Sequence, residues 1–175
     1  MRKALFLAVI SLATLISTSC SRTKKLAKQH NDLKDTYETL KQDMAEAQVS
    51  MEGEKVKVVL PEAILFTINS AELNKNYLPI MAKMATVLNK YPKTSILVTG
   101  YTDATGTNDY NLELSKKRAE SAKAILIENK VSEGRILTWG LGSKNPVGDN
   151  NTIEGRKQNR RVEYVIMYDY KAEKK

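Results

Sequence analysis

The feature that most limits the fold of this chain is an alternation of strand-like and helix-like segments between residues 56 and 170. Short β-branched or apolar runs at 56–60, 95–99, 136–139 and 161–170 predict strands. Apolar residues spaced three or four apart over 74–91 and 109–129 predict two helices with one buried side each. The order β-α-β-α-β-β predicts an α+β domain, residues 56–170, whose sheet carries its helices on one side.

Residues 1–19 have the pattern of a signal peptide. Arg2 and Lys3 precede an apolar stretch, residues 4–16, and small residues lead to Cys20. The apolar stretch is shorter than the roughly 20 residues that a membrane span requires. The small residues before Cys20 resemble the lipobox of bacterial lipoproteins, although Ser17 replaces the usual aliphatic residue. We therefore predict that Cys20 becomes an acylated first residue; a secreted protein with a free thiol is the alternative.

The residue after the cysteine bears on the destination of such a lipoprotein. Ser21, rather than Asp, resembles the sorting pattern of lipoproteins that reach the outer membrane. We expect a lipid-anchored protein of the outer membrane whose domain faces the periplasm.

Residues 20–55 predict a helical spacer between the lipidated cysteine and the domain. Leu26, Leu33, Leu40 and Ala47 recur every seven residues, and His30, Tyr37, Met44 and Met51 follow each of them by four. This spacing places both sets on one stripe of a helix. The stripe is compatible with self-association through a coiled coil and equally with a solvated amphipathic spacer.

The composition excludes several kinds of site. With one cysteine and one histidine, the chain has too few soft ligands for a zinc site, and we predict no metal and no cofactor. The formal net charge of +8 is spread among acidic residues and forms no long basic run, so we predict no nucleic-acid partner. The lysines of residues 171–175 predict a solvated basic tail.

Three polar clusters, at 69–70, 100–106 and 150–161, are predicted to lie in loops that follow the predicted strands or precede the last one. In the second cluster Asp103 follows a buried strand, and Arg118 lies early in the next helix, so the two side chains can face one cleft. Such a pair could bind a ligand that carries both an ammonium and a carboxylate group. In the alternative interpretation Asp103 caps a turn or a helix and Arg118 pairs with a neighbour such as Glu113.

Residues 64–163 resemble the OmpA-like peptidoglycan-binding domain. The matching positions are Ile64 to Phe66, Ser70 to Leu73, Gly100, Thr102, Asp103, Gly106, Asn111, Leu114, Ser115, Arg118, Ala119, Arg135, Ile136, Gly140, Gly142, Pro146, Asn150, Thr152, Gly155, Arg156 and Asn159 to Glu163. The resemblance implies a mixed four-stranded sheet and noncovalent tethering of the outer membrane to peptidoglycan.

The resemblance also implies roles for particular residues. Residues matching Asp103 and Arg118 hold the meso-diaminopimelate of a stem peptide in that family. Further binding positions of the family match Asn69, Thr105, Asn111 and Arg160. The chain departs from the family at two positions, with Tyr101 where His is usual and Thr67 where Asp is common.

Two other functions are alternatives to peptidoglycan binding. A wall hydrolase needs paired carboxylates at a fixed separation, and the sequence singles out no second acid beside Asp103; we therefore predict that the chain is not an enzyme. A structural lipoprotein that binds partners through the helical spacer remains the alternative.

Overall fold

The computed structural model describes residues 2–67 and 70–168, with side chains from residue 21 onward. The chain divides into two compact units, one ending at Asp32 and one beginning at Leu33. A single helix, α1 (Arg2–Asp43), runs through the first unit and enters the second. Over the part of the chain that the structure describes, no helix combines the length and apolarity of a membrane span.

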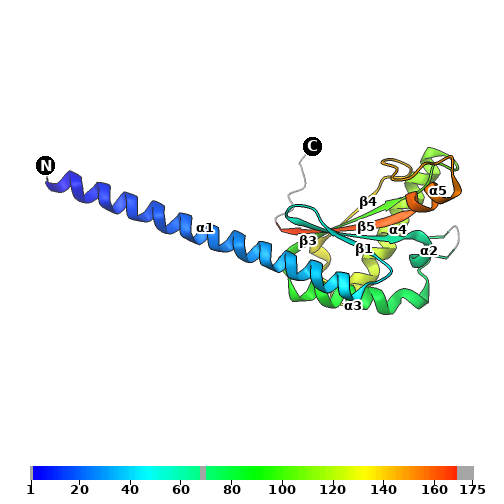
Figure 1. Ribbon diagram of the computed structural model, residues 1–175, viewed down its shortest axis with the longest axis horizontal. Helices are drawn as coiled ribbons and strands as arrows, with labels where there is room; N and C mark the ends of the chain where they lie inside the picture. Colours follow the sequence, from blue (N-terminus) through cyan, green and yellow to red (C-terminus); the bar gives the residue numbers. More distant parts are fainter. Residues whose placement is uncertain (1, 68–69, 169–175) are drawn as a thin grey trace. The chain divides into compact units, whose positions relative to one another are not determined.

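The second unit is built on a mixed sheet of five strands (Figure 1). The strands are β1 (Gln48–Met51), β2 (Lys55–Pro61), β3 (Thr94–Tyr101), β4 (Ile136–Gly140) and β5 (Arg161–Tyr168). They lie in the order β1-β2-β5-β3-β4, and only the β3–β4 pair is parallel. The prediction of a mixed sheet is confirmed, although it has one strand more than predicted. The basic tail and the end of the predicted last strand lie outside the described residues.

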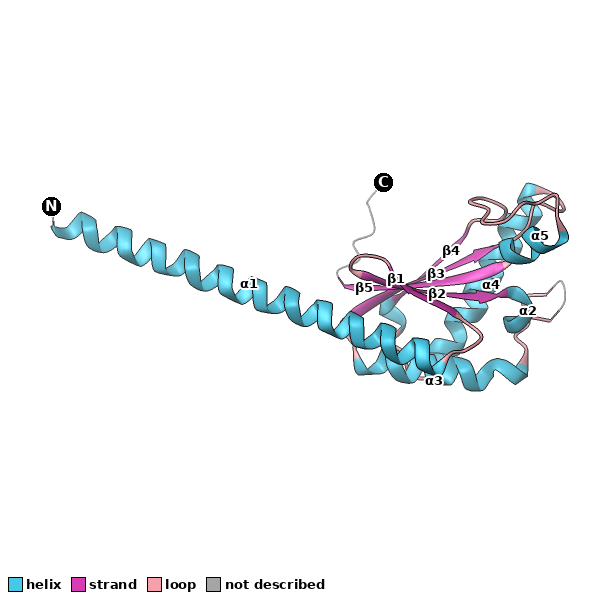
Figure 2. Cartoon of the chain, viewed as in Figure 1, coloured by secondary structure: helices cyan, strands magenta, loops and turns pink. Residues whose placement is uncertain are grey.

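Two long helices cover one face of this sheet, as Figure 2 shows: α3 (Leu78–Lys90) and α4 (Asn108–Glu128). Alternate residues of the central strands point toward them and are buried, such as Val162, Tyr164 and Ile166 on β5. The shorter helices are α2 (Glu62–Leu65), η1 (Lys75–Tyr77), η2 (Glu133–Arg135) and α5 (Ile153–Asn159). Helices α2 and α5 lie at the same end of the sheet, and this end carries the candidate site described below.

The spacer differs from its prediction at its C-terminal end. Helix α1 ends at Asp43, and β1 forms within the range predicted as helical, where it pairs with β2. Leu33, Leu40 and Met44 are at most 1% exposed and belong to the core of the second unit. The heptad stripe is therefore partly an internal contact, and these three residues are not available for self-association.

Close contact between the sheet and α4 depends on a glycine at the end of β3. A Cβ atom on Gly100 would lie 2.1 Å from the backbone oxygen of Ser115 on α4. We expect Gly100→Ala to lower the free energy of unfolding by about 2–3 kcal/mol, because neither backbone can move aside without repacking. Urea unfolding measures this change. The control is Gly134→Ala, since nothing lies within 4 Å of a Cβ there; equal stability of the two variants would contradict the expected overlap.

Candidate functional site

A cleft opens at the end of the sheet where β2 meets α2 and β3 runs into the loop before α4. Its volume is about 670 Å³. The lining residues are Glu62, Ala63, Phe66, Thr102, Asp103, Thr105, Tyr110, Asn111, Leu114, Arg118, Arg156 and Arg160. Three arginines and two carboxylates thus face one space, and the chemistry of the cleft is mainly ionic.

Asp103 lies directly after β3 and is 6% exposed. Its Oδ1 accepts hydrogen bonds from the Thr105 hydroxyl and from the Thr105 backbone N–H, the latter at 2.9 Å. Its Oδ2 accepts one from Arg160 Nη1 at 2.7 Å. Burial opposes ionisation of Asp103, but the bonds from Thr105 and Arg160 outweigh it and hold the pKa of the carboxyl below its usual range. Asp103 is therefore a fixed negative charge at neutral pH.

Arg118 reaches the cleft from α4, and its side chain is only 3% exposed. Its Nε donates to the backbone oxygen of Ser70 at 3.0 Å, and its Nη2 donates to Glu62 Oε1 at 2.5 Å. The guanidinium carbon lies 5.5 Å from the centre of the Phe66 ring. These contacts come from three directions and hold the guanidinium in one orientation before any ligand arrives.

Arg160 connects the two carboxylates of the cleft. Its Nη1 bonds Asp103, and its Nε lies 3.2 Å from Glu62 Oε2. This second distance is that of an ion pair, but its geometry does not make a hydrogen bond, and Glu62 Oε2 has no hydrogen-bond donor. The charges of the cleft therefore form one chain, from Asp103 through Arg160 and Glu62 to Arg118.

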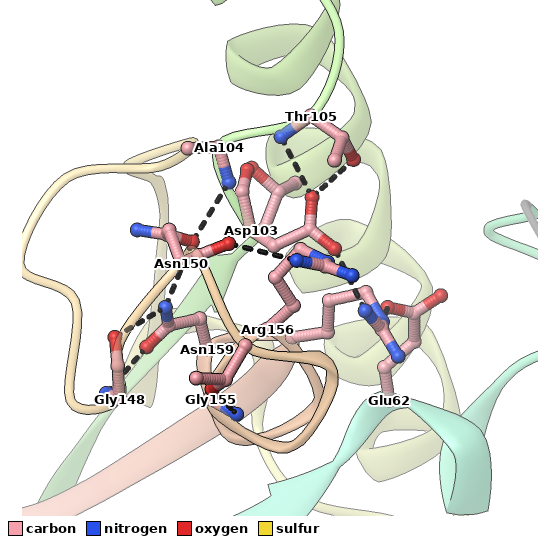
Figure 3. Close-up of polar contacts among 12 residues, drawn as sticks. Glu62, Asp103, Ala104, Thr105, Gly148, Asn150, Gly155, Arg156 and Asn159 are labelled. Atoms are coloured by element: carbon pink, nitrogen blue, oxygen red, sulfur yellow. Dashed lines mark hydrogen bonds and ion pairs between the residues drawn. The ribbon is translucent and has the colours of Figure 1, made fainter.

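Asparagine side chains fix the two loops that carry these groups (Figure 3). Asn150 Oδ1 accepts from the Ala104 backbone N–H at 3.1 Å and from Asn159 Nδ2 at 2.9 Å. On the other side, Asn111 Nδ2 donates to the Thr105 backbone oxygen at 2.8 Å. Because these amides bond backbone atoms of the Asp103 loop, they set the position of the carboxylate.

The structure brings together most of the residues that the sequence singled out. Asp103, Thr105, Asn111, Arg118 and Arg160 all line the cleft. Asn69 lies outside the described residues.

The alternative pairing of Arg118 with a neighbour such as Glu113 is wrong, because the acidic partner of Arg118 is the distant Glu62 at 2.5 Å, while Glu113 pairs with Lys117 at 3.7 Å. A turn-capping role for Asp103 does occur, through the Thr105 backbone N–H, and it coexists with the ion pair to Arg160.

Glu62, Tyr110 and Arg156 also line the cleft, and the sequence did not indicate a binding role for any of them. Glu62 had a recognisable signal, because it is the only charged residue within the run from Val58 to Phe66. It is also a second acid in the same cleft as Asp103, which the sequence did not predict.

Tyr101, which stands where the family usually has His, lies on the face of the sheet opposite α3 and α4. The Tyr101 ring packs against the guanidinium of Arg161, whose carbon lies 3.8 Å from the ring centre. Burial, followed by the nearby Glu163 carboxylate, raises the pKa of Tyr101. Tyr101 is not among the residues that line the cleft.

The fold and the cleft define a small α+β binding domain with a preorganised ionic site. Residues 65–160 match the OmpA family, and the chain belongs to this family.

Individual relatives extend this assignment. The chain is 42% identical over 118 residues to the probable lipoprotein YiaD of Escherichia coli, covering 67% of this chain and 54% of that protein. The chain therefore spans about half the length of this curated relative.

Two solved structures resemble the domain. The cell wall anchor of the T6SS from Pseudomonas aeruginosa superimposes with a TM-score of 0.69 and 28% identity, over 77% of this chain and 97% of that one. The peptidoglycan-associated lipoprotein from Burkholderia pseudomallei gives a TM-score of 0.55 and 31% identity, over 59% of this chain and 88% of that one. A cell wall anchor and a peptidoglycan-associated lipoprotein thus share this fold.

Proposed function

We propose that this chain is a lipoprotein of the outer membrane whose cleft binds the meso-diaminopimelate end of peptidoglycan stem peptides without a covalent bond. The observation that carries the proposal is the placement of Asp103 and Arg118 in one cleft. A diaminopimelate side chain ends in an ammonium and a carboxylate on one carbon atom. Asp103 accepts the ammonium, and the Arg118 guanidinium binds the carboxylate.

The ion pairs of the cleft indicate how strong a single site can be. Hydrogen bonds to charged groups contribute roughly 1.5–3 kcal/mol each, but Arg118 and Asp103 already have partners of their own. A ligand therefore exchanges some internal contacts for its own, and we expect an affinity of roughly micromolar or weaker. Many copies on one membrane facing many stem peptides raise the effective strength of the tether.

The anchoring part of the proposal rests on Cys20 and on the relatives. The leader and the small residues before Cys20 resemble a lipoprotein cleavage site, and two of the similar proteins are lipoproteins by name. Acyl chains on Cys20 insert into the membrane and hold the chain there. The domain then faces the wall from the periplasmic side.

A second carboxylate in the cleft calls for a comparison with wall hydrolases. Glycoside hydrolysis requires an acid that is protonated near neutral pH, with a raised pKa. Asp103 has the opposite property, because Thr105 and Arg160 hold its pKa low against the effect of burial. Glu62 is in contact with two arginines. These surroundings favour binding over hydrolysis.

The proposal is tested by co-sedimentation of residues 21–175 with insoluble peptidoglycan of the diaminopimelate type. We expect the wild-type chain to pellet, and Asp103→Ala and Arg118→Ala to remain in the supernatant while folded. The matched control is Arg135→Ala, because Arg135 bonds the backbone oxygens of Leu88, Tyr91 and Thr94 away from the cleft. If the wild type stays in solution, or all variants pellet equally, the cleft does not bind peptidoglycan.

The ionisation of Asp103 predicts how binding depends on pH. Because the pKa of Asp103 is lowered, its carboxylate stays charged at any pH above about 3.9, the usual pKa of an aspartate side chain. Both its ion pair and its contribution to stability persist there, and they are lost as the pH falls through the folded-state pKa. We expect peptidoglycan retention to be constant between about pH 8 and pH 5. A loss of retention centred above about pH 5 would show that another group controls binding.

A further inference from the structure

The acid that the sequence did not single out, Glu62, occupies an unusual position in the cleft. It is the first residue of α2, and its backbone N–H donates to the Arg160 backbone oxygen at 2.9 Å. The residue is 8% exposed. Among the side chains that the structure describes, Glu62 Oε2 is the only buried nitrogen or oxygen atom without a hydrogen bond.

A buried carboxylate oxygen without a donor costs free energy, so such atoms are uncommon unless they have a function. Glu62 lines the cleft together with Asp103, and Arg160 contacts both of them. The two carboxylates therefore lie on either side of one guanidinium. An ammonium group carries three N–H donors, which is enough to bond both carboxylates at once.

We propose that Glu62 determines specificity in this cleft, with Oε2 accepting a hydrogen bond from the ligand ammonium beside Asp103. This inference rests on the proposed function and adds a second acid to it. Its consequence is selection for stem peptides whose diaminopimelate side chain ends in a free amine. An amide at this side-chain nitrogen has neither the positive charge nor the three N–H donors of an ammonium group. Stem peptides whose amine is consumed by a cross-link are then excluded by two carboxylates.

The opposite role for Glu62 would be to occupy the place of the ligand carboxylate on Arg118 until a ligand displaces it. The contacts of Arg118 argue against displacement. Its Nε and Nη2 have partners, but its Nη1 makes no hydrogen bond to any residue that the structure describes. A ligand carboxylate can therefore reach Arg118 through Nη1 while Glu62 stays in place. The two roles predict changes of opposite sign when the charge on Glu62 is removed.

The test is calorimetric titration of the full chain, purified in detergent, with two soluble stem tripeptides. One tripeptide contains meso-diaminopimelate, and the other has hydrogen in place of its side-chain amine. We expect Glu62→Gln to weaken binding of the first peptide about tenfold. We also expect removal of the amine from the peptide to lower the affinity of the wild type by a larger factor than it lowers the affinity of Glu62→Gln. Such a difference indicates direct coupling between Glu62 and the ligand amine.

Two further variants keep the experiment decisive. Glu62→Asp retains the charge next to Arg118 but draws the oxygen back, so it should also weaken binding of the amine-bearing peptide even if Glu62→Gln is unstable. Glu113→Gln is the control, since Glu113 pairs with Lys117 outside the cleft, and it should bind like the wild type.

The outcomes separate this inference from the proposed function. If the wild type binds the diaminopimelate peptide and Glu62→Gln binds it equally or more tightly, the role of Glu62 is overturned and the proposed function stands. If the wild type binds neither peptide, the proposed function and the inference both fail.

Discussion

An Arg118→Ala variant is expected to bind diaminopimelate stem peptides roughly a hundredfold more weakly than the wild type. The loss corresponds to about 3 kcal/mol, the contribution of one or two hydrogen bonds to a charged group. The guanidinium is fixed by Ser70, Glu62 and Phe66, so the substitution removes a preorganised partner of the ligand carboxylate. Calorimetric titration of residues 21–175 with a soluble tripeptide measures the change.

The same substitution affects folding, because it leaves Glu62 buried without its closest partner. Breaking a buried ion pair from one side costs about 3–5 kcal/mol. Arg118→Lys separates the two effects, since it keeps the charge but lacks the planar guanidinium that holds Ser70 and Glu62 through Nε and Nη2 and leaves Nη1 for the ligand. We expect this variant to be more stable than Arg118→Ala and still to bind at least about tenfold more weakly than the wild type. Wild-type affinity in Arg118→Lys would show that carboxylate binding needs only the charge at this position and not the guanidinium geometry.

The second large effect is expected at the anchor. Cys20→Ser should move the protein from the membrane fraction to the soluble periplasmic fraction. Each buried methylene of an acyl chain contributes about 0.8 kcal/mol, so several chains bind almost irreversibly and their loss releases the protein. Fractionation of cells, followed by mass measurement of the N-terminal peptide, tests this expectation.

Ser21→Ala is the control for the anchor, because it changes the neighbouring residue without removing the thiol. It should remain in a membrane fraction. If Cys20→Ser and Ser21→Ala fractionate alike, acylation of Cys20 does not hold the protein at the membrane.

Periodicity was sufficient to predict the elements that have a long buried face. The helical spacing over 109–129 corresponds to α4, and the run at 95–99 corresponds to β3. Elements with little buried area were missed. Strand β1 has only four residues and lies within the segment whose heptad spacing predicted a helix. Helix α5 has seven residues and lies within a polar stretch that we expected to be a loop. Short elements are stabilised mainly by tertiary contacts, which leave little pattern in the sequence.

The heptad stripe shows a different limit. The spacing of Leu33, Leu40 and Met44 correctly placed them on one side of a helix, and all three are buried. Periodicity identifies an apolar face but not what covers it. Here the cover is the core of the same chain, whereas a second copy would have produced the same pattern.

The sequence was sufficient to predict which residues form the site but not which of them contact one another. The resemblance to the OmpA-like domain selected Asp103, Arg118 and Arg160, and the structure places them in one cleft. The ion pairs between them could not be predicted, because Arg118 and Glu62 are 56 positions apart and meet only through the fold. Glu62 carried the weaker signal of an acid within an apolar run, which is a place where a charge needs a partner.

The central claim is that the cleft recognises an ammonium and a carboxylate on one carbon atom. The most direct test titrates wild-type residues 21–175 with two soluble tripeptides that differ only at the third residue, meso-diaminopimelate in one and lysine in the other. Lysine keeps the terminal amine and lacks the terminal carboxylate, so it removes only the group assigned to Arg118. We predict that the diaminopimelate peptide binds at least about tenfold more tightly. Equal affinity for the two peptides would contradict the proposed recognition.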